Sequence, residues 1–254
     1  EKRLLNEKNE IYTVKEKTNS DYNRTTPSSY VLNIDSVYSN TMAVKYLKEI
    51  RGFNIFPDEL KYFVGKHKNE ATNKISTIEL VGFINESNGA DGKYFAGNWI
   101  GKPKSCGTKD ITILNKHNLN KKNIDFIVAE SQWDLIAFFN DPDCKKVMDN
   151  CVNIVLNGTS VDKTIDFINT HKNRDSALYL LRQADISNAK AMQRLHFGTG
   201  ITKISHFNYT DEEVERKKDV NDLLRDGVKL SDRINLNLRT LNEENTNKNY
   251  LDVV

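Results

Sequence analysis

The sequence predicts an α/β protein in which a parallel sheet flanked by helices follows a small mixed α+β subdomain. Two observations support this prediction. Between residues 124 and 207, apolar runs alternate with amphipathic stretches, which is the pattern of β-α units in a parallel sheet. Between residues 78 and 114, short β-like runs are separated by turns that contain glycine and asparagine, which is typical of antiparallel strands. A chain of 254 residues is long enough to bury a sizeable core.

The composition divides the chain into four segments. Residues 1–28 are polar and end near a proline and two serines, which predicts a leader or linker. Residues 29–120 form the predicted mixed subdomain, 121–210 the parallel-sheet domain, and 211–254 a charged helical segment with a tail. The first residues show neither an initiating methionine nor an apolar signal core, so we expect a fragment of a longer, non-secreted protein.

The mixed subdomain begins with a predicted helix. Ser39 or Asn40 would be its N-cap, an apolar stripe would form its buried face, and Gly52 would end it. A second short helix is predicted after Pro57. Three β-like runs follow, and they read TIELVGFI, KYFAGNWI and KDITIL.

The parallel-sheet domain contains four predicted strands, IDFIVA, VNIVLN, SALYLL and ITKISHF. The helices between them are expected to begin near Gln132, Val161 and Ser187. After the last strand, the segment DEEVERKKDVNDLLRDG predicts a charged helix or loop and helix.

The composition also argues against several classes of protein. No apolar run approaches the ~20 residues that cross a bilayer, so no membrane role is expected. A formal charge of +2 is too near neutral to indicate nucleic-acid binding, which would need local basic patches. Cysteines without CxxC pairs or zinc-site spacing favour the reducing cytoplasm: Cys106, Cys144 and Cys151. Lone histidines without metal-site spacing are interpreted as structural: His171, His196 and His206.

Acidic side chains follow two of the predicted parallel strands. Glu130 ends the strand IDFIVA, and Asp185 follows the strand SALYLL. Because ligands bind at the carboxyl ends of parallel strands, these carboxylates can share one site, and hard oxygen donors suit Mg²⁺. Asp134 lies one helical turn beyond Glu130 and could ligate the metal or orient its waters. Taken singly, such acids are more often helix N-caps or solvated loop residues.

The order of these motifs resembles the Toprim domain of bacterial primases, topoisomerases and some nucleases. The resemblance runs through FIVAESQWDLIAFF, NIVLNGTS and LYLLRQADISNAKAMQRL. Upstream, ELVGFINESNGADGKYFAGNWIGKPKSCGTKDIT is similar to the small subdomain that precedes Toprim in replicative primases of bacteria, plasmids and phages. Downstream, KKDVNDLLRDG is similar to a further segment of these enzymes. The resemblance therefore points to the catalytic core of a DnaG-type primase, of bacterial, plasmid, phage or other mobile-element origin.

The resemblance implies nucleotidyl transfer that makes short primers on single-stranded DNA with Mg²⁺ or Mn²⁺. Glu130, Asp134 and Asp185 would be catalytic and would bind the metal, with Asp219 and Asp222 in a second ring. The implied partners are single-stranded DNA and nucleoside triphosphates, and a replicative helicase is a further candidate. The residues that would hold template or triphosphate are Lys102, Lys104, Lys109, Arg182 and Gln183. For the three lysines, a solvated basic loop is an equally good interpretation.

The sequence departs from the Toprim pattern at Gln183, where the family usually has the first acid of an Asp-x-Asp pair. A neutral glutamine oxygen binds Mg²⁺ more weakly than a carboxylate does. Ser131 and Asn188 occupy positions at which glycine is usual. Two alternatives to a primase therefore stay open, a metal-dependent Toprim nuclease and a catalytically weakened module that binds DNA or the replisome.

Overall fold

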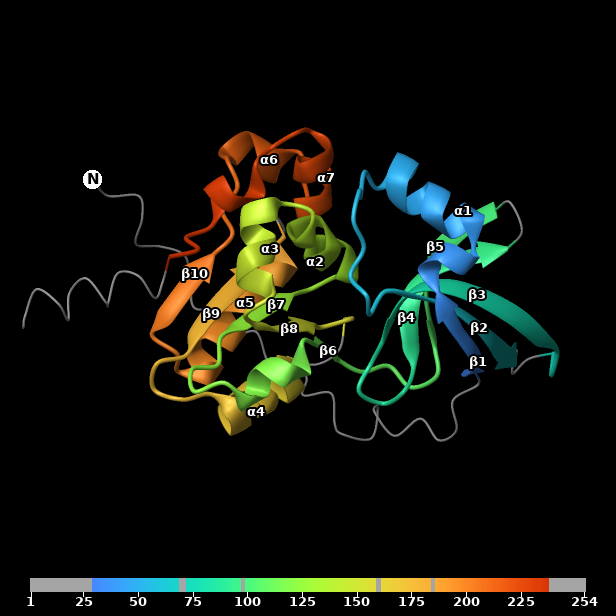
Figure 1. Cartoon of the computed structure of the whole chain (residues 1–254), viewed down its shortest axis with the longest axis horizontal. Coiled ribbons are helices and arrows are strands. Elements are labelled where there is room, and N and C mark those ends of the chain that lie inside the picture. Colours follow the sequence, from blue (N-terminus) through green and yellow to red (C-terminus); the bar gives the residue numbers. More distant parts are fainter. Residues whose placement is uncertain (1–28, 69–71, 97–98, 159–160, 184–185, 238–254) are drawn as a thin grey trace, which may run out of the picture.

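The computed structural model describes residues 29–68, 72–96, 99–158, 161–183 and 186–237, with only the backbone described at 29, 96, 99–104 and 186–189. Figure 1 shows two β-sheets side by side along the long axis of the molecule, with most of the helices packed around the second sheet. An antiparallel sheet with a helical segment comes first in the chain, and a mostly parallel sheet with flanking helices follows it. The predicted α/β class is confirmed.

The first sheet is antiparallel throughout, in the strand order β1-β2-β3-β4-β5. The three C-terminal strands of this sheet lie in the predicted antiparallel region. The strands are β1 (Ser29–Ser36), β2 (Lys61–Lys68), β3 (Ile75–Ile84), β4 (Ala90–Ala96) and β5 (Trp99–Cys106). Strands β1 and β2 were not predicted.

The helix predicted after Pro57 is wrong. The backbone N–H of Leu60 donates to the carbonyl oxygen of Pro57 at 3.0 Å, which closes a single turn, and β2 begins at the next residue. The segment KYFVGKHK buries Tyr62 and Phe63 and pairs along its whole length with β3. Pairing with a sheet therefore overrides any local helical preference.

The helix predicted in the first subdomain is present. A 3-10 turn, η2 (Val37–Ser39), leads into α1 (Thr41–Lys45), which continues as a π-helical turn, η3 (Tyr46–Ile50). The Asn40 side chain accepts a hydrogen bond from the backbone N–H of Ala43 at 2.9 Å, so Asn40 is the N-cap of α1. The chain leaves the helix at Gly52, whose φ of 74° lies in the left-handed region that glycine tolerates best.

The second sheet has the strand order β10-β9-β7-β8-β6. The four predicted strands are confirmed and parallel, as β7 (Phe126–Ala129), β8 (Val152–Val155), β9 (Ala177–Leu181) and β10 (Lys203–His206). Strand β6 (Thr112–Leu114) was predicted as part of the first antiparallel region, but it pairs antiparallel with β8. The change of sheet therefore falls between Cys106 and Thr112, ahead of the predicted boundary at residue 120.

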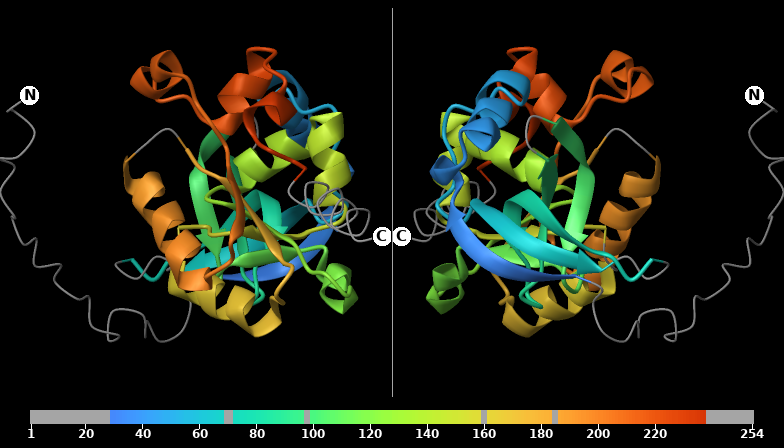
Figure 2. Two further views of the ribbon diagram at one scale, coloured as in Figure 1. Left: turned by 90° about the vertical axis from the view of Figure 1, so that its left-hand side faces the viewer. Right: turned by 90° about the vertical axis from the view of Figure 1, so that its right-hand side faces the viewer.

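Helices cover both faces of the second sheet (Figure 2). In β7, Phe126 and Val128 pack into the cluster that contains the apolar residues of α4 (Val161–His171) and α5 (Ile186–Thr199). Ile127 and Ala129 point to the other face, toward α2 (Gln132–Phe139) and α3 (Pro142–Met148). This alternation is the period of two expected of a strand that is buried on both faces.

The remaining helical elements are short. Helices α6 (Asp211–Glu215) and α7 (Val220–Arg225) confirm the predicted charged helical segment, and α7 packs against α2. The 3-10 turns η4 (Lys116–Asn120) and η5 (Leu230–Arg233) complete the described chain. Within that part of the chain, no helix is long and apolar enough to cross a membrane.

One hydrophobic core connects the two sheets. It contains Leu47 and Phe83 from the first subdomain together with Trp133 from α2 and Leu223 from α7. The side chains of Cys106, Cys144 and Cys151 are all buried. The predicted leader at 1–28 and the tail beyond residue 237 lie outside the described residues. The four-segment division of the chain stays a prediction.

The N-cap of α1 is testable because the sequence offered two candidates for it. Asn40→Ala should lower the free energy of unfolding by about 1 kcal/mol, since the Ala43 N–H loses its partner. Ser39→Ala is the matched control and should change stability by less than about 0.5 kcal/mol, because Ser39 is exposed and lies before the cap. Urea unfolding of both variants measures the difference, and an equal effect of the two changes would contradict the assignment of the cap.

Candidate functional site

The candidate site lies where β7 ends and α2 begins. Glu130 follows the last residue of β7 and is partly exposed. The Ser131 hydroxyl then accepts hydrogen bonds from the backbone N–H groups of Trp133 and Asp134, at 3.1 and 3.4 Å, and caps α2. This cap turns the chain sharply, so that Asp134 lies in the first turn of the helix, close to the carboxyl edge of the sheet.

Asp134 is the most constrained acid of the site. Its side chain is completely buried, and Oδ2 accepts a hydrogen bond from Nε2 of Gln183 at 2.8 Å. The pKa of Asp134 is raised to about 7. Burial is the main cause, followed by the charge of Asp219 and, more weakly, that of Glu130, while hydrogen bonds from the Gln183 amide and the Ser131 hydroxyl lower it. No described residue is in hydrogen-bonding geometry with its Oδ1. One oxygen of a buried carboxylate is therefore uncompensated.

Asp219 brings a second acid to this place from the C-terminal segment. It is the N-cap of α7, and its side chain accepts a hydrogen bond from the backbone N–H of Asp222 at 2.7 Å. The Asp222 carboxylate accepts in return from the backbone N–H of Asp219 at 3.3 Å, which completes a capping box. Burial raises the pKa of Asp219, and the nearby Arg51 opposes that rise. Asp222 thus has a helix-capping contact that its position in the sequence did not suggest.

Two cations of the first subdomain lie near each other, and Arg51 also lies close to Asp219; sequence reasoning missed both. Arg51 donates through Nε to the Tyr46 hydroxyl at 2.6 Å and through a terminal nitrogen to Oδ1 of Asn221 at 2.9 Å. Its guanidinium carbon lies 5.0 Å from the centre of the Trp133 ring. Nζ of Lys93 lies 5.9 Å from the centre of the Tyr46 ring, and burial, then the charge of Arg51, lowers its pKa.

No local signal in the sequence could have found this pair. Arg51 stands at the end of a helix, where basic residues are common, and Lys93 is a polar residue within a β-strand. The approach of Arg51 to Asp219 depends on packing between segments that are far apart in the sequence.

The structure brings some of the predicted residues together and leaves others undescribed. The charges of Glu130 and Asp219 both raise the pKa of Asp134, and the Gln183 amide donates a hydrogen bond to its carboxylate. Nε of Arg182 donates to the carbonyl oxygen of Phe207 at 2.7 Å, at the neighbouring strand end. The predicted ligand at position 185 and two predicted basic side chains lie outside the described residues: Asp185, Lys102 and Lys104.

Lys109 is exposed and lies beside the turn that follows β8. Its Nζ would be 3.2 Å from a Cβ added to Gly158, just beyond the carboxyl end of that strand. Strand β8 pairs in parallel with β7, so the two strands end at the same edge of the sheet. Lys109 therefore lies on the edge that also carries Glu130.

The acids do not by themselves make a full protein cage for a metal. Among the residues with described side chains, no group of three or more His, Cys, Asp or Glu is arranged to hold a metal ion. Mg²⁺ commonly uses only one or two carboxylates and takes its other ligands from water and phosphate. The donor types present here are compatible with that mode of binding.

Comparison with known proteins finds similarity at the level of structure. No family model and no curated protein matches the sequence. The fold is similar to the primase fragment of the bacteriophage T7 primase-helicase protein, with a TM-score of 0.43 and 14% identity over 83% of this chain and 81% of that one. It is also similar to a chain from a structure of the bacteriophage T7 lagging-strand DNA polymerase interacting with primase domains bound to an RNA/DNA hybrid and dTTP. That match has a TM-score of 0.40 and 12% identity over 81% of this chain and 92% of that one.

The raised pKa of Asp134 predicts a dependence of stability on pH. Because the folded-state pKa of about 7 exceeds the ordinary value of 3.8, the stabilising contribution of protonated Asp134 is present below the ordinary pKa and is lost as pH rises through about 7. In metal-free buffer, wild type should lose more free energy of unfolding between pH 5 and pH 8 than Asp134→Asn does.

Urea unfolding at the two pH values in the presence of a chelator measures this loss. Asp166→Asn, which changes an exposed acid on α4, is the control and should keep the wild-type dependence. Equal pH dependence in wild type and Asp134→Asn would contradict the buried, uncompensated state of Asp134.

Proposed function

We propose that this chain is a primase-type nucleotidyltransferase that joins nucleotides on a single-stranded DNA template with the help of a divalent cation. The observation that supports it most is the state of Asp134, which is completely buried and keeps one oxygen without a hydrogen-bond partner among the described residues, near two further carboxylates. Such a carboxyl group either keeps its proton or, when ionised, needs a cation to compensate its negative charge. A bound cation would supply that compensation.

The residues present fit Mg²⁺ or Mn²⁺. Carboxylate oxygens are the donors that these hard cations prefer, and partly exposed Glu130 leaves room for water and phosphate ligands. In the proposal, Glu130 and Asp185 would hold the cation, Asp134 would support them, and Asp219 and Asp222 would form a second ring. When bound, the cation would neutralise charge on the triphosphate and on the departing pyrophosphate.

The side chains of the chain position and neutralise the reactants. A 3′-hydroxyl loses its proton to water, and its oxygen attacks the α-phosphate of an incoming nucleoside triphosphate. The new phosphodiester bond forms as the bond from the α-phosphorus to the bridging oxygen of the β-phosphate breaks, and pyrophosphate leaves. Arg51, Lys93 and Lys109 are the described cations that would attract the triphosphate or the template. The carboxylates would hold the cation next to the reacting α-phosphate.

The direct test is synthesis of short products. The purified protein, incubated with single-stranded DNA, labelled nucleoside triphosphates and Mn²⁺, should yield oligomers whose length depends on the template. Glu130→Gln should lower the yield by about 100-fold or more, because it removes a negative ligand from the reacting centre. Glu86→Gln is the matched control, since Glu86 pairs with Lys116 in a turn of the first subdomain, and it should leave the yield unchanged. Absence of product from wild type with either metal would contradict the proposal.

One contact favours a second candidate, a module that binds single-stranded DNA and has weakened catalysis. The Gln183 amide satisfies one oxygen of Asp134 without any metal. A neutral residue at this position also leaves one negative charge fewer for the cation. Binding of single strands that is independent of metal and unchanged by Glu130→Gln would favour this candidate. Release of fragments from labelled DNA without added triphosphates would instead indicate a metal-dependent nuclease.

Replacing Gln183 by an acid distinguishes between these possibilities. In chelator, Gln183→Asp should have a lower melting temperature than wild type, because a second carboxylate then lies near Asp134. Added Mn²⁺ should raise the melting temperature of Gln183→Asp more than it raises that of wild type. Gln183→Asn keeps the amide and is the control, which should gain no additional stabilisation from the metal. A Gln183→Asp protein that Mn²⁺ stabilises no more than wild type would argue against a cation at this site.

A further inference from the structure

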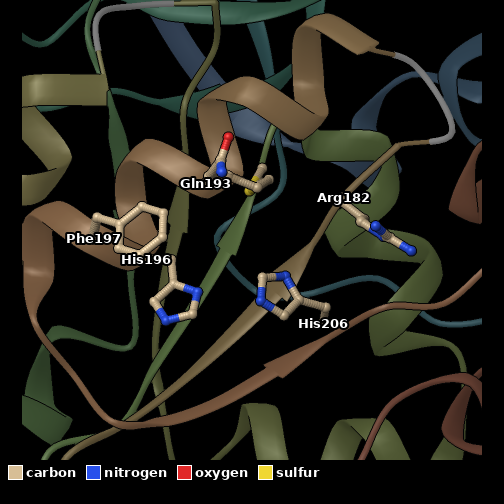
Figure 3. A pocket seen from close by; sticks show the side chains of 6 residues that line it. Arg182, Gln193, His196, Phe197 and His206 are labelled. Carbon is tan, nitrogen blue, oxygen red and sulfur yellow. The ribbon is translucent and has the colours of Figure 1, made fainter. Parts of the chain in front are cut away.

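A cavity lies next to the acidic site, between α5, β10 and the end of β9. Its volume is about 230 Å³. Figure 3 shows Gln193, His196 and Phe197 on the helix, His206 on the neighbouring strand and Arg182 at the strand end. Met192 completes the lining. Neither the proposed cation site nor the capping contacts described above use these residues, apart from Arg182, which was predicted to hold nucleic acid.

The cavity is bordered by an exposed aromatic surface. Phe197 is 72% exposed, although it is a large apolar side chain on a regular helix. Its ring stacks on the ring of His196, with the centres 5.0 Å apart and the planes 17° from parallel. The His196 ring in turn lies 5.7 Å from that of His206. Stacking on one side fixes the Phe197 ring while it stays largely open to solvent, which is the arrangement that a stacking ligand requires.

Among the residues with described side chains, the cavity carries positive charge without a compensating acid. None of the six described lining residues is acidic. Arg182 uses Nε to donate to the Phe207 carbonyl oxygen, and its two terminal nitrogens have no hydrogen-bond partner among the described residues. Burial, then the charges of His196 and Arg182, lowers the pKa of His206, so this imidazole is neutral at pH 7. The Arg182 guanidinium is a fixed positive charge in the cavity.

We propose that this cavity is a stacking subsite for one nucleotide of a single-stranded nucleic acid, with the base on Phe197 and a phosphate at Arg182. Base-aromatic stacking and guanidinium-phosphate contacts are the two interactions with which proteins hold single strands. The volume lies below the roughly 300–1,000 Å³ of pockets that enclose a whole small ligand. It therefore suits one ring of a strand that passes over the surface better than a complete nucleoside triphosphate.

The position of the subsite connects it to the acidic site. Arg182 is followed directly by Gln183, whose amide donates to Asp134. A single-stranded nucleic acid bound at Arg182 would therefore pass close to the carboxyl edge of the second sheet. This inference rests on the proposed function in its choice of a nucleic-acid ligand, but binding of a strand is measured separately from synthesis.

The test is binding of a short fluorescently labelled oligothymidylate by the whole chain, followed by anisotropy in chelator. Phe197→Ala should weaken binding by roughly 5- to 150-fold, which corresponds to the loss of one stacked base. Phe197→Trp should keep wild-type affinity, whereas Phe197→Leu should bind as weakly as alanine because it lacks an aromatic face. Tyr38→Ala is the matched control, since Tyr38 is a 65% exposed aromatic residue of the first subdomain, and it should leave binding unchanged.

Salt dependence tests the role assigned to Arg182. Arg182→Gln should reduce the slope of log affinity against log salt by about 0.7, which is the value for one phosphate contact with a single strand. A merely structural Arg182 would change affinity without changing that slope. Far-ultraviolet circular dichroism checks that each variant is folded, because the Phe207 contact is lost in this one.

The outcomes separate this inference from the proposed function. Unchanged affinity of a folded Phe197→Ala protein, or a Phe197→Leu protein that binds as tightly as wild type, would overturn the subsite even if wild type makes primers. Weakened strand binding by Phe197→Ala supports the subsite even if wild type makes none. Displacement of the oligonucleotide by ATP, with equal loss of ATP affinity in Phe197→Ala, would show a mononucleotide site and would also overturn the inference.

Discussion

The contact between Asp134 and Gln183 is the constraint on which the candidate site depends. It joins the first turn of α2 to the end of β9 across 49 positions of the chain, and its Asp134 side is completely buried. An ionised carboxylate in such a place needs compensation at both oxygens, and the described residues provide a hydrogen bond at one. The pKa of Asp134 therefore depends on the charges near it, above all on those of Asp219 and Glu130.

Apolar packing places the cations relative to these acids. Trp133 precedes Asp134 in α2, and its ring lies 6.0 Å from that of Tyr46 and beneath the guanidinium of Arg51. Arg51 also contacts Asn221 in α7, the helix that Asp219 caps. Three segments that are distant in the sequence thus meet at one point, and the shared core between the sheets keeps positive and negative groups at fixed separation.

Local patterns predicted the elements, whereas contacts between distant segments decided the details. The Asn40 cap and the four parallel strands follow from residue type and periodicity, and the place of Glu130 follows from the end of a strand. Strand β6 has three residues, too few for its pattern to choose between two sheets. The complete burial of Asp134 and the approach of Arg51 could not be predicted, because both depend on α7 packing against α2.

The glutamine at position 183 changes what the proposed site requires. A carboxylate there would lie near Asp134, and two like charges in a buried place tolerate each other only with a proton or a cation between them. The amide removes that requirement, because it donates where an acid would repel. Under the proposed function, the chain therefore keeps a stable fold without metal and binds the cation with fewer charges. Lower affinity for the cation follows from the same hydrogen bond that stabilises the metal-free protein.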